Sequence, residues 1–303
     1  MFSLLKPPPK ATPVDSEKVV PVYQWLRWQV FIGIFVGYAG YYLVRKNFSL
    51  AIPELEAMGY SKSDLGFALS AVSIAYGISK FVMGGVSDQC NARFFLPIGL
   101  LLSGGIMVWM GLSHWAVSSI SVMFTLLFLN GWFQGMGWPP SGRVMVHWFS
   151  QKERGTKMSI WNIAHNIGGG LVGPLAIGAV AYFKIWQSML FVPGVIAIVI
   201  SFIAFLLIRD TPESQGLPPI EVYKKDATAQ VQEMSEALPL KQLLLKYVLY
   251  NKLLWYIALA NAFIYLVRYG VLDWSPTYLK QVKHYDLSGS GWAYFAYEYA
   301  GIP

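Results

Sequence analysis

Apolar residues along this chain gather in long stretches separated by short polar segments, a pattern typical of helices that cross a membrane. A spanning helix needs about 20 consecutive, mostly apolar residues. Six stretches of this length precede residue 210, a seventh follows a polar segment, and an eighth begins near Trp292. We expect spans at residues 28–52, 65–86, 94–111, 118–138, 158–183, 186–208 and 253–272, and the start of another at 292–303. The sequence therefore predicts an all-α membrane protein.

Composition supports this prediction and removes several classes of function. Of the 303 residues, 55% are hydrophobic and only 13% are charged, whereas soluble domains have about 25% charged residues. The single cysteine, Cys90, permits no intrachain disulfide and no cysteine metal site. A net charge of +7 is better explained by basic loops beside a membrane than by nucleic acid binding. We therefore expect lipid, and no nucleic acid, among the partners.

The polar segments divide the chain into four parts. We expect a cytoplasmic N-terminal tail at 1–27, a six-helix bundle at 28–208, a cytoplasmic linker at 209–251 and the start of a second bundle at 252–303. The linker holds Pro212, Pro218 and Pro219 and charges of both signs, which predicts an exposed tether. Residues 1–20 show no apolar core before a cleavage site, so we predict no signal peptide.

The basic residues predict the orientation in the membrane. With the N-terminus inside, fifteen Lys and Arg residues fall in cytoplasmic segments and four in outer loops. Because cytoplasmic loops carry the excess of Lys and Arg, the N-terminus should be cytoplasmic. The other four basic residues, Arg45, Lys46, Lys80 and Arg268, lie in or at the ends of spans.

An internal repeat relates the first and seventh spans. Tyr42-Leu43-Val44-Arg45 recurs as Tyr265-Leu266-Val267-Arg268, 223 residues later, and Pro53 and Pro276 keep the same offset. Two parallel six-helix repeats are the architecture of the major facilitator transporters, whose substrates sit near the midplane between the halves. Since two repeats of 223 residues would total 446, we expect the second repeat to be incomplete here, as in a truncated product or fragment.

The duplicated arginines are the first candidates for a binding site. An arginine inside a spanning helix costs about 2.5–3.5 kcal/mol, so each should face a watery cavity or a partner. Tyr38, Tyr42 and Arg45 follow i, i+4, i+7 spacing, as do Asn261, Tyr265 and Arg268. Two guanidinium groups from opposite halves could grip a phosphate in bidentate fashion. The alternative is that either arginine lies at the interface and snorkels or pairs with a loop carboxylate.

Polar side chains of other spans add weaker candidates. Asn162, His165 and Asn166 share one helix face, where a histidine could be a ligand that titrates near neutral pH or a satisfied structural group. Ser73, Tyr76 and Lys80 form another stripe, and for Asn130 and Gln134 we expect hydrogen bonds between helices. The sequence holds no nucleotide loop, metal cluster or nucleophile–base pair, so we expect neither an enzyme nor a cofactor.

Several motifs narrow the interpretation. Gly84, Asp88 and Arg93 resemble the loop signature of the major facilitator superfamily, although Gln89 stands where a basic residue is usual. Five runs resemble the organophosphate:phosphate antiporter family: 37–47 (GYAGYYLVRKN), 135–155 (GMGWPPSGRVMVHWFSQKERG), 161–170 (WNIAHNIGGG), 210–223 (DTPESQGLPPIEVY) and 251–283. The resemblance covers nearly the whole chain.

This resemblance implies a function and a set of site residues. It implies a monomeric antiporter of the bacterial inner membrane that takes up glycerol-3-phosphate in exchange for inorganic phosphate by a rocker-switch motion. It assigns phosphate binding to Arg45, Arg268 and His165, cavity contacts to Tyr38, Tyr42, Tyr76, Asn162 and Tyr265, and charge networks between the halves to Lys46 with Asp273 and Lys80 with Glu298; Lys80 is also a candidate substrate ligand. Two alternatives stay open: a phosphate-ester sensor on the same fold, and an inactive fragment.

Overall fold

The computed structural model describes residues 5–225 and 249–302, and within these ranges the regular structure is helical. The helices are α1 (Val19–Leu43), α2 (Asn47–Ala57), α3 (Lys62–Asp88), α4 (Ala92–Leu112), α5 (Ile120–Gln134), α6 (Trp138–Trp148), α7 (Gln151–Phe183), α8 (Ser188–Leu207), α9 (Ile220–Lys224), α12 (Lys252–Gln281) and α13 (Leu287–Tyr299), with 3-10 turns η1 (His114–Val117) and η2 (Glu213–Gln215). Seven helical segments of this part of the chain are long and apolar enough to cross a membrane. The predicted all-α membrane fold is confirmed.

Helix breaks interrupt two of the predicted spans, one inside the first span and one at the C-terminal end of the fourth, which continues past its predicted end as α6. The first divides into α1 and α2 at residues 44–46, and the fourth divides into α5 and α6 at residues 135–137. At the first break the helix tightens, with the Arg45 amide bonding to the Tyr42 carbonyl at 3.4 Å. Side-chain amides of α5 satisfy the carbonyls there: Asn130 donates to Val44 at 3.1 Å and Gln134 to Tyr41 at 3.1 Å. The predicted interhelical role of these two residues is thereby confirmed.

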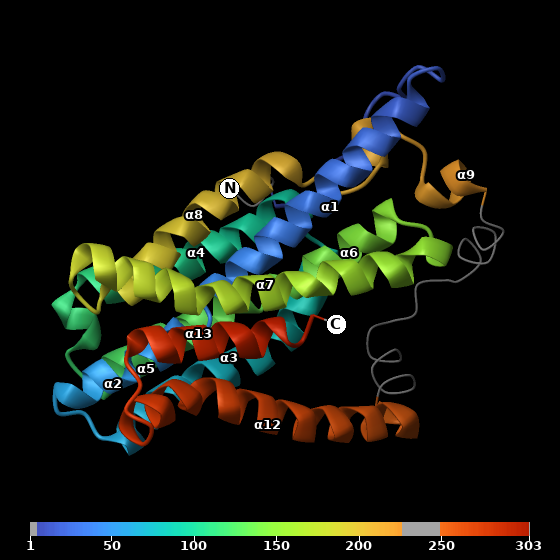
Figure 1. Cartoon of the computed structure of the whole chain (residues 1–303). Coiled ribbons are helices and arrows are strands. Elements are labelled where there is room, and N and C mark those ends of the chain that lie inside the picture. The colour runs from blue at the N-terminus through green and yellow to red at the C-terminus, as the bar shows by residue number, and fades with distance from the viewer. Residues whose placement is uncertain (1–4, 226–248, 303) are drawn as a thin grey trace.

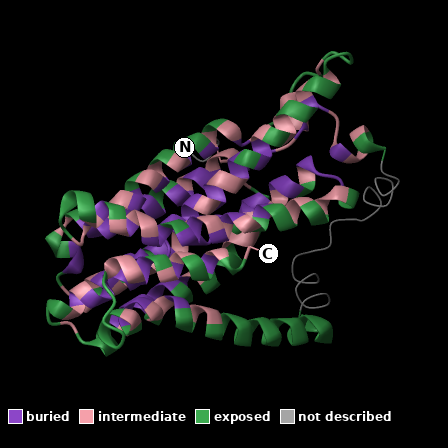
Figure 2. Cartoon of the chain, in the orientation of Figure 1, coloured by how far each residue is buried: buried purple, intermediate pink, exposed green. Residues whose placement is uncertain are grey.

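Helices α1 to α8 form one bundle. Helix α1 packs between α7 and α8, while α4 pairs with α8 and α3 with α5 (Figure 1). Trp148 and Trp161 are among its largest fully buried side chains. Buried residues lie on the helix faces that meet within the bundle, and exposed apolar residues lie on its outside, as expected where lipid replaces water (Figure 2).

Helices α12 and α13 belong to the second repeat and contact the first at one end of the bundle. Helix α12 packs along α2, and α13 packs along α7 (Figure 1). The α7–α13 contact is very close, since a Cβ atom on Gly173 would lie 2.2 Å from the Gly291 carbonyl oxygen. Near the C-terminal end of α12, Lys280 forms an ion pair with Glu54 at 2.6 Å. Toward Lys252 the helix is exposed, so the two repeats meet at one end and diverge at the other.

The first part of the predicted tether packs against the bundle. Leu217 and Ile220 are buried in its core, and the ring of Tyr223 stacks on Tyr23 with centroids 4.1 Å apart. Asp210 accepts two hydrogen bonds from Arg143, at 3.0 and 2.9 Å, which anchor the chain as it leaves α8. The expectation of an exposed connector is wrong for residues 209–225, because an apolar residue pair and a buried carboxylate hold them. Residues 226–248 of the predicted linker lie outside the described residues.

The predicted N-terminal tail is also partly ordered. Helix α1 begins at Val19, nine residues earlier than expected, because the polar end of the helix extends beyond the apolar stretch. The segment before it pairs with the linker: the Ala11 amide bonds to the Glu213 carbonyl at 3.0 Å and the Val14 amide to the Gly216 carbonyl at 2.9 Å. Tail and linker therefore lie side by side on one end of the bundle.

Candidate functional site: a cationic cavity between the repeats

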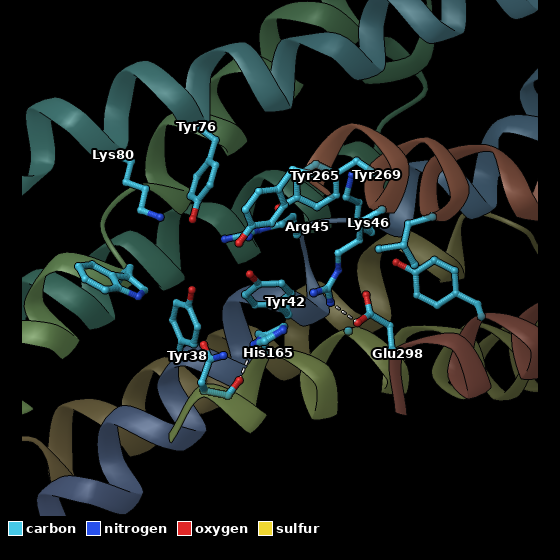
Figure 3. Close-up of a pocket in the computed structure, with 16 residues that line it drawn as sticks. Tyr38, Tyr42, Arg45, Lys46, Tyr76, Lys80, His165, Tyr265, Tyr269 and Glu298 are labelled. Carbon is cyan, nitrogen blue, oxygen red and sulfur yellow. Dashed lines mark hydrogen bonds and ion pairs between the residues drawn. The ribbon is translucent and has the colours of Figure 1, made fainter. Parts of the chain in front are cut away.

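A cavity of about 420 Å³ lies between the first bundle and helices α12 and α13 (Figure 3). It is lined by Tyr38, Tyr42, Arg45, Lys46, Tyr76, Lys80, Trp138, Asn162, His165, Gly169, Tyr265, Arg268, Tyr269, Leu272, Tyr294 and Glu298. All nine residues predicted to bind substrate are in this set, as are Lys46 and Glu298. The structure thus brings the sequence candidates together, while their roles in binding stay predictions.

Arg45 lies at the break between α1 and α2 and is almost completely buried, with 5% of its surface exposed. Its guanidinium lies 4.0 Å from the Tyr42 ring centroid and 4.4 Å from that of Tyr76. Its Nε atom donates to Oε1 of Gln134 at 3.0 Å, whereas Nη1 and Nη2 find no hydrogen-bond partner among the described residues. Two unpaired donors on a buried cation are costly unless an anion completes them.

Arg268 reaches the same cavity from the second repeat, on α12. Its Nη2 atom donates to Oε2 of Glu298 on α13 at 2.8 Å, and the Glu298 side chain is only 2% exposed. The predicted pairing of Lys80 with Glu298 is therefore not the contact found. Lys80 instead lies over the rings of Tyr76 and Trp138, at 5.6 and 5.3 Å from their centroids, because α3 places it across the cavity from Glu298 (Figure 3).

Lys46 and Asp273 form the other predicted pair between the repeats, and the structure shows it as an ion pair. Ser49 also donates to Asp273, at 3.3 Å, and the Lys46 ammonium lies 4.4 Å from the ring centroid of Tyr269. The charge of Lys46 is thereby balanced within the protein. Arg45 and Lys80 remain the cavity cations for which the described residues show no carboxylate partner.

His165 approaches the cavity from α7, beside Tyr42, with ring centroids 5.4 Å apart. Its Nδ1 atom contacts the carbonyl oxygen of Asn162, one turn earlier. Because a carbonyl only accepts, this contact requires a hydrogen on Nδ1, so Nε2 accepts in the neutral ring and donates to an anion only when the ring is doubly protonated. The neighbouring Asn166 is buried and does not line the cavity, and Asn261 bonds to the Ile257 carbonyl instead of extending the polar stripe of α12.

Aromatic rings build most of the remaining wall. Tyr38 stacks on Trp161 at 4.4 Å, and Tyr265 stacks on Tyr269 at 5.3 Å. Sequence reasoning missed five lining residues, namely Trp138, Gly169, Tyr269, Leu272 and Tyr294. The internal repeat could have identified Tyr269 as a lining residue, because Tyr269 follows Arg268 as Lys46 follows Arg45. Helical spacing could have identified Tyr294, because it precedes the candidate residue Glu298 by one turn and so shares its helix face.

The cavity has the chemistry of an anion site. It combines the buried guanidinium of Arg45, the half-buried guanidinium of Arg268, an imidazole and tyrosine hydroxyl groups, and both repeats contribute to it. Among the described residues, no group of three or more His, Cys, Asp or Glu could hold a metal ion.

Comparison with known proteins supports the assignment of the fold. The family model of the Major Facilitator Superfamily matches residues 32–303. The glycerol-3-phosphate transporter of Bacillus subtilis (strain 168) is 56% identical over 304 residues, covering 100% of this chain and 68% of that protein. The membrane sensor protein UhpC of Salmonella typhimurium is 37% identical over 305 residues, covering 100% of this chain and 68% of that protein.

A solved structure shows the same fold. An inward-facing, unoccupied bacterial homologue of the human lysosomal transporter Spinster superposes with a TM-score of 0.65 at 17% identity, covering 89% of this chain and 59% of that one. The chain belongs to the major facilitator superfamily and, within it, to the group that includes the Bacillus subtilis transporter. It is thus a multi-pass protein of a transporter family and not an enzyme.

Proposed function

We propose that this protein is a secondary transporter that exchanges glycerol-3-phosphate for inorganic phosphate across the bacterial inner membrane. The observation that carries the proposal is the pair of arginines, Arg45 and Arg268, which the two repeats direct into one cavity. The unpaired Nη1 and Nη2 atoms of Arg45 match the oxygens of a phosphate group. The 56% identical glycerol-3-phosphate transporter supports the choice of ester.

The contacts between the repeats support alternating access. The repeats touch near Glu54 and Lys280 and diverge toward Lys252, so the cavity is closed at one end. An incoming phosphate would compete with Glu298 for Arg268 and so couple binding to the interface between α12 and α13. Arg268 and Glu298 belong to the second repeat, whose helices α12 and α13 pack on α2 and α7 of the first. Exchange follows because only a loaded carrier would shift α12 and α13 against these helices and reopen at the other end.

The orientation is part of the proposal. In the topology expected from the sequence, fifteen Lys and Arg residues fall in segments on the side of the N-terminus and four on the other side, so we place the N-terminus in the cytoplasm. A protease added to inside-out membrane vesicles should then cleave the tail, and protection of the tail would reverse the orientation. We propose that the transporter acts as a monomer, because both arginines come from one chain.

Exchange in sealed liposomes tests the proposal. Liposomes that contain the protein and are loaded with inorganic phosphate should take up labelled glycerol-3-phosphate without ATP, and liposomes loaded with sulfate should take up much less. Uptake that required ATP and ignored internal phosphate would contradict an exchange driven by the phosphate gradient.

A sensor is the second candidate, favoured by the 37% identity to a membrane sensor protein. A sensor would bind the phosphate ester in the same cavity without exchanging it. Binding of glycerol-3-phosphate to the purified protein, together with no exchange in phosphate-loaded liposomes, would contradict exchange by this chain and favour the sensor or an inactive fragment.

A further inference from the structure

Tyr294 of α13 carries a buried hydroxyl group that has no role in the proposed exchange. Its side chain lines the cavity, only 1% of its surface is exposed, and its oxygen finds no hydrogen-bond partner among the described residues. Buried polar groups nearly always have partners, so an orphan hydroxyl calls for an explanation. One explanation is that its partner is present in another state of the protein.

The surroundings of Tyr294 indicate which group that partner is. Tyr294 and Glu298 lie one helical turn apart and therefore on the same face of α13, and both line the cavity. The candidate carboxylates of the second repeat are those of Glu298, which lines the cavity, and Asp273, which pairs with the lining residue Lys46. Asp273 already has Lys46 and Ser49 as partners. Glu298 has Arg268, at 2.8 Å.

Substrate binding would remove that partner. If Arg268 turns to a phosphate dianion, the Glu298 carboxylate loses its ion pair while its side chain remains 2% exposed. A buried carboxylate without a partner is strongly unfavourable, and a nearby O–H donor can offset much of this cost. A tyrosine suits this task because it donates a hydrogen bond but brings no charge that would compete for the phosphate.

We propose that Tyr294 is a positioning residue that donates its hydroxyl hydrogen to Glu298 when the phosphate takes Arg268. It acts through Glu298 and does not touch the substrate. The hydroxyl is unsatisfied in the ion-paired state, so it favours the state in which Arg268 is released. This inference rests on the proposed function, and it adds the group that stabilises the Glu298 carboxylate once Arg268 is released.

The test is a double-mutant cycle with inorganic phosphate as the probe. Tyr294→Phe keeps the ring and removes the donor. In purified protein in lipid nanodiscs, Tyr294→Phe should weaken phosphate binding roughly tenfold, the range expected for a hydrogen bond to a charged group. In a Glu298→Gln background, which has no buried carboxylate to stabilise, adding Tyr294→Phe should change phosphate binding less than twofold.

Tyr23→Phe is the matched control, because Tyr23 is also fully buried with an orphan hydroxyl but lies outside the cavity. It should bind phosphate like the wild type. Wild-type affinity in Tyr294→Phe would overturn the inference, and so would an equal loss in the Glu298→Gln background, which would indicate direct contact or a packing defect. Absence of phosphate binding by the wild type would instead overturn the proposed function and this inference with it.

Discussion

The Nε atom of Arg45 donates a 3.0 Å hydrogen bond to Oε1 of Gln134, so a residue of α5 sets the orientation of a cavity guanidinium at the break between α1 and α2. Gln134 is itself fixed, because its amide donates to the Tyr41 carbonyl at 3.1 Å and to the Ser103 hydroxyl at 2.8 Å. The bond occupies Nε and leaves Nη1 and Nη2 facing the cavity. The break in the first span and the presentation of Arg45 are therefore one structural feature.

The first prediction concerns this positioning bond. Gln134→Leu removes the acceptor for Arg45 Nε and should weaken phosphate binding about tenfold, since hydrogen bonds to charged groups contribute about 1.5–3 kcal/mol. Gln29→Leu is the matched control, because Gln29 also donates to a carbonyl, that of Leu207, but lies away from the cavity. Titration calorimetry measures both. Equal phosphate affinities for the two variants would exclude the positioning role of Gln134.

The second prediction separates the two nitrogens of His165. If Nε2 of the doubly protonated ring donates to the phosphate, Gln at this position can place its amide N–H near the former Nε2, while Asn can mimic only Nδ1. His165→Gln should then retain phosphate affinity within about threefold. His165→Asn should bind phosphate about tenfold more weakly, because the lost hydrogen bond contributes about 1.4 kcal/mol. If both variants bind as tightly as the wild type, His165 is a packing residue.

The third prediction concerns the contact between α7 and α13. Gly173→Ala would place a Cβ atom 2.2 Å from the Gly291 carbonyl oxygen, and backbone cannot yield without separating the helices. We expect a loss of about 1–3 kcal/mol in stability, as for other overpacked sites, seen as earlier thermal unfolding in detergent. Gly178→Ala on the same helix meets no atom within 4 Å and should be neutral. Similar unfolding of both variants would show that the close contact is unimportant.

How far the sequence predicted this molecule depended on the kind of signal. Duplication of the Tyr-Leu-Val-Arg motif placed Arg45 and Arg268 together, because a repeat reports on the symmetry of the fold. Hydropathy located the spans but averaged over the break at residues 44–46, where side chains of a distant helix replace backbone hydrogen bonds. Hydrogen bonds between side chains and a distant backbone produce no periodic pattern in the sequence, so hydropathy does not reveal them.

The ion-pair partners of the charged residues were harder to predict than which charged residues line the cavity. Lys46 pairs with Asp273 as expected, but Glu298 pairs with Arg268 and not with Lys80, since which cation reaches a carboxylate depends on helix rotation. The linker was misjudged for a similar reason. Its prolines and charges suggest exposure, yet Leu217 and Ile220 are buried in the core of the bundle, and Asp210 pairs with Arg143.

The fourth prediction tests the anchor of the linker. Asp210 is 1% exposed and Arg143 is 13% exposed, and removing one member of such a buried pair costs about 3–5 kcal/mol. Asp210→Asn should lower stability by about 3 kcal/mol and speed hydrogen exchange in residues 209–225, while phosphate affinity stays normal. Asp15→Asn breaks an exposed pair with Lys18 and should change neither quantity measurably. Unchanged hydrogen exchange of residues 209–225 in Asp210→Asn would show that the apolar contacts alone hold the linker.

The central claim is that two guanidinium groups, one from each repeat, grip the phosphate. Its most direct test is the phosphate affinity of Arg45→Lys and Arg268→Lys, measured by titration of protein that has reached the membrane and purifies as a single species. Lysine keeps the charge but loses the planar fork, so each variant should bind phosphate at least about tenfold more weakly, and the double variant should show no measurable binding. Near-normal affinity in both single variants would contradict the clamp.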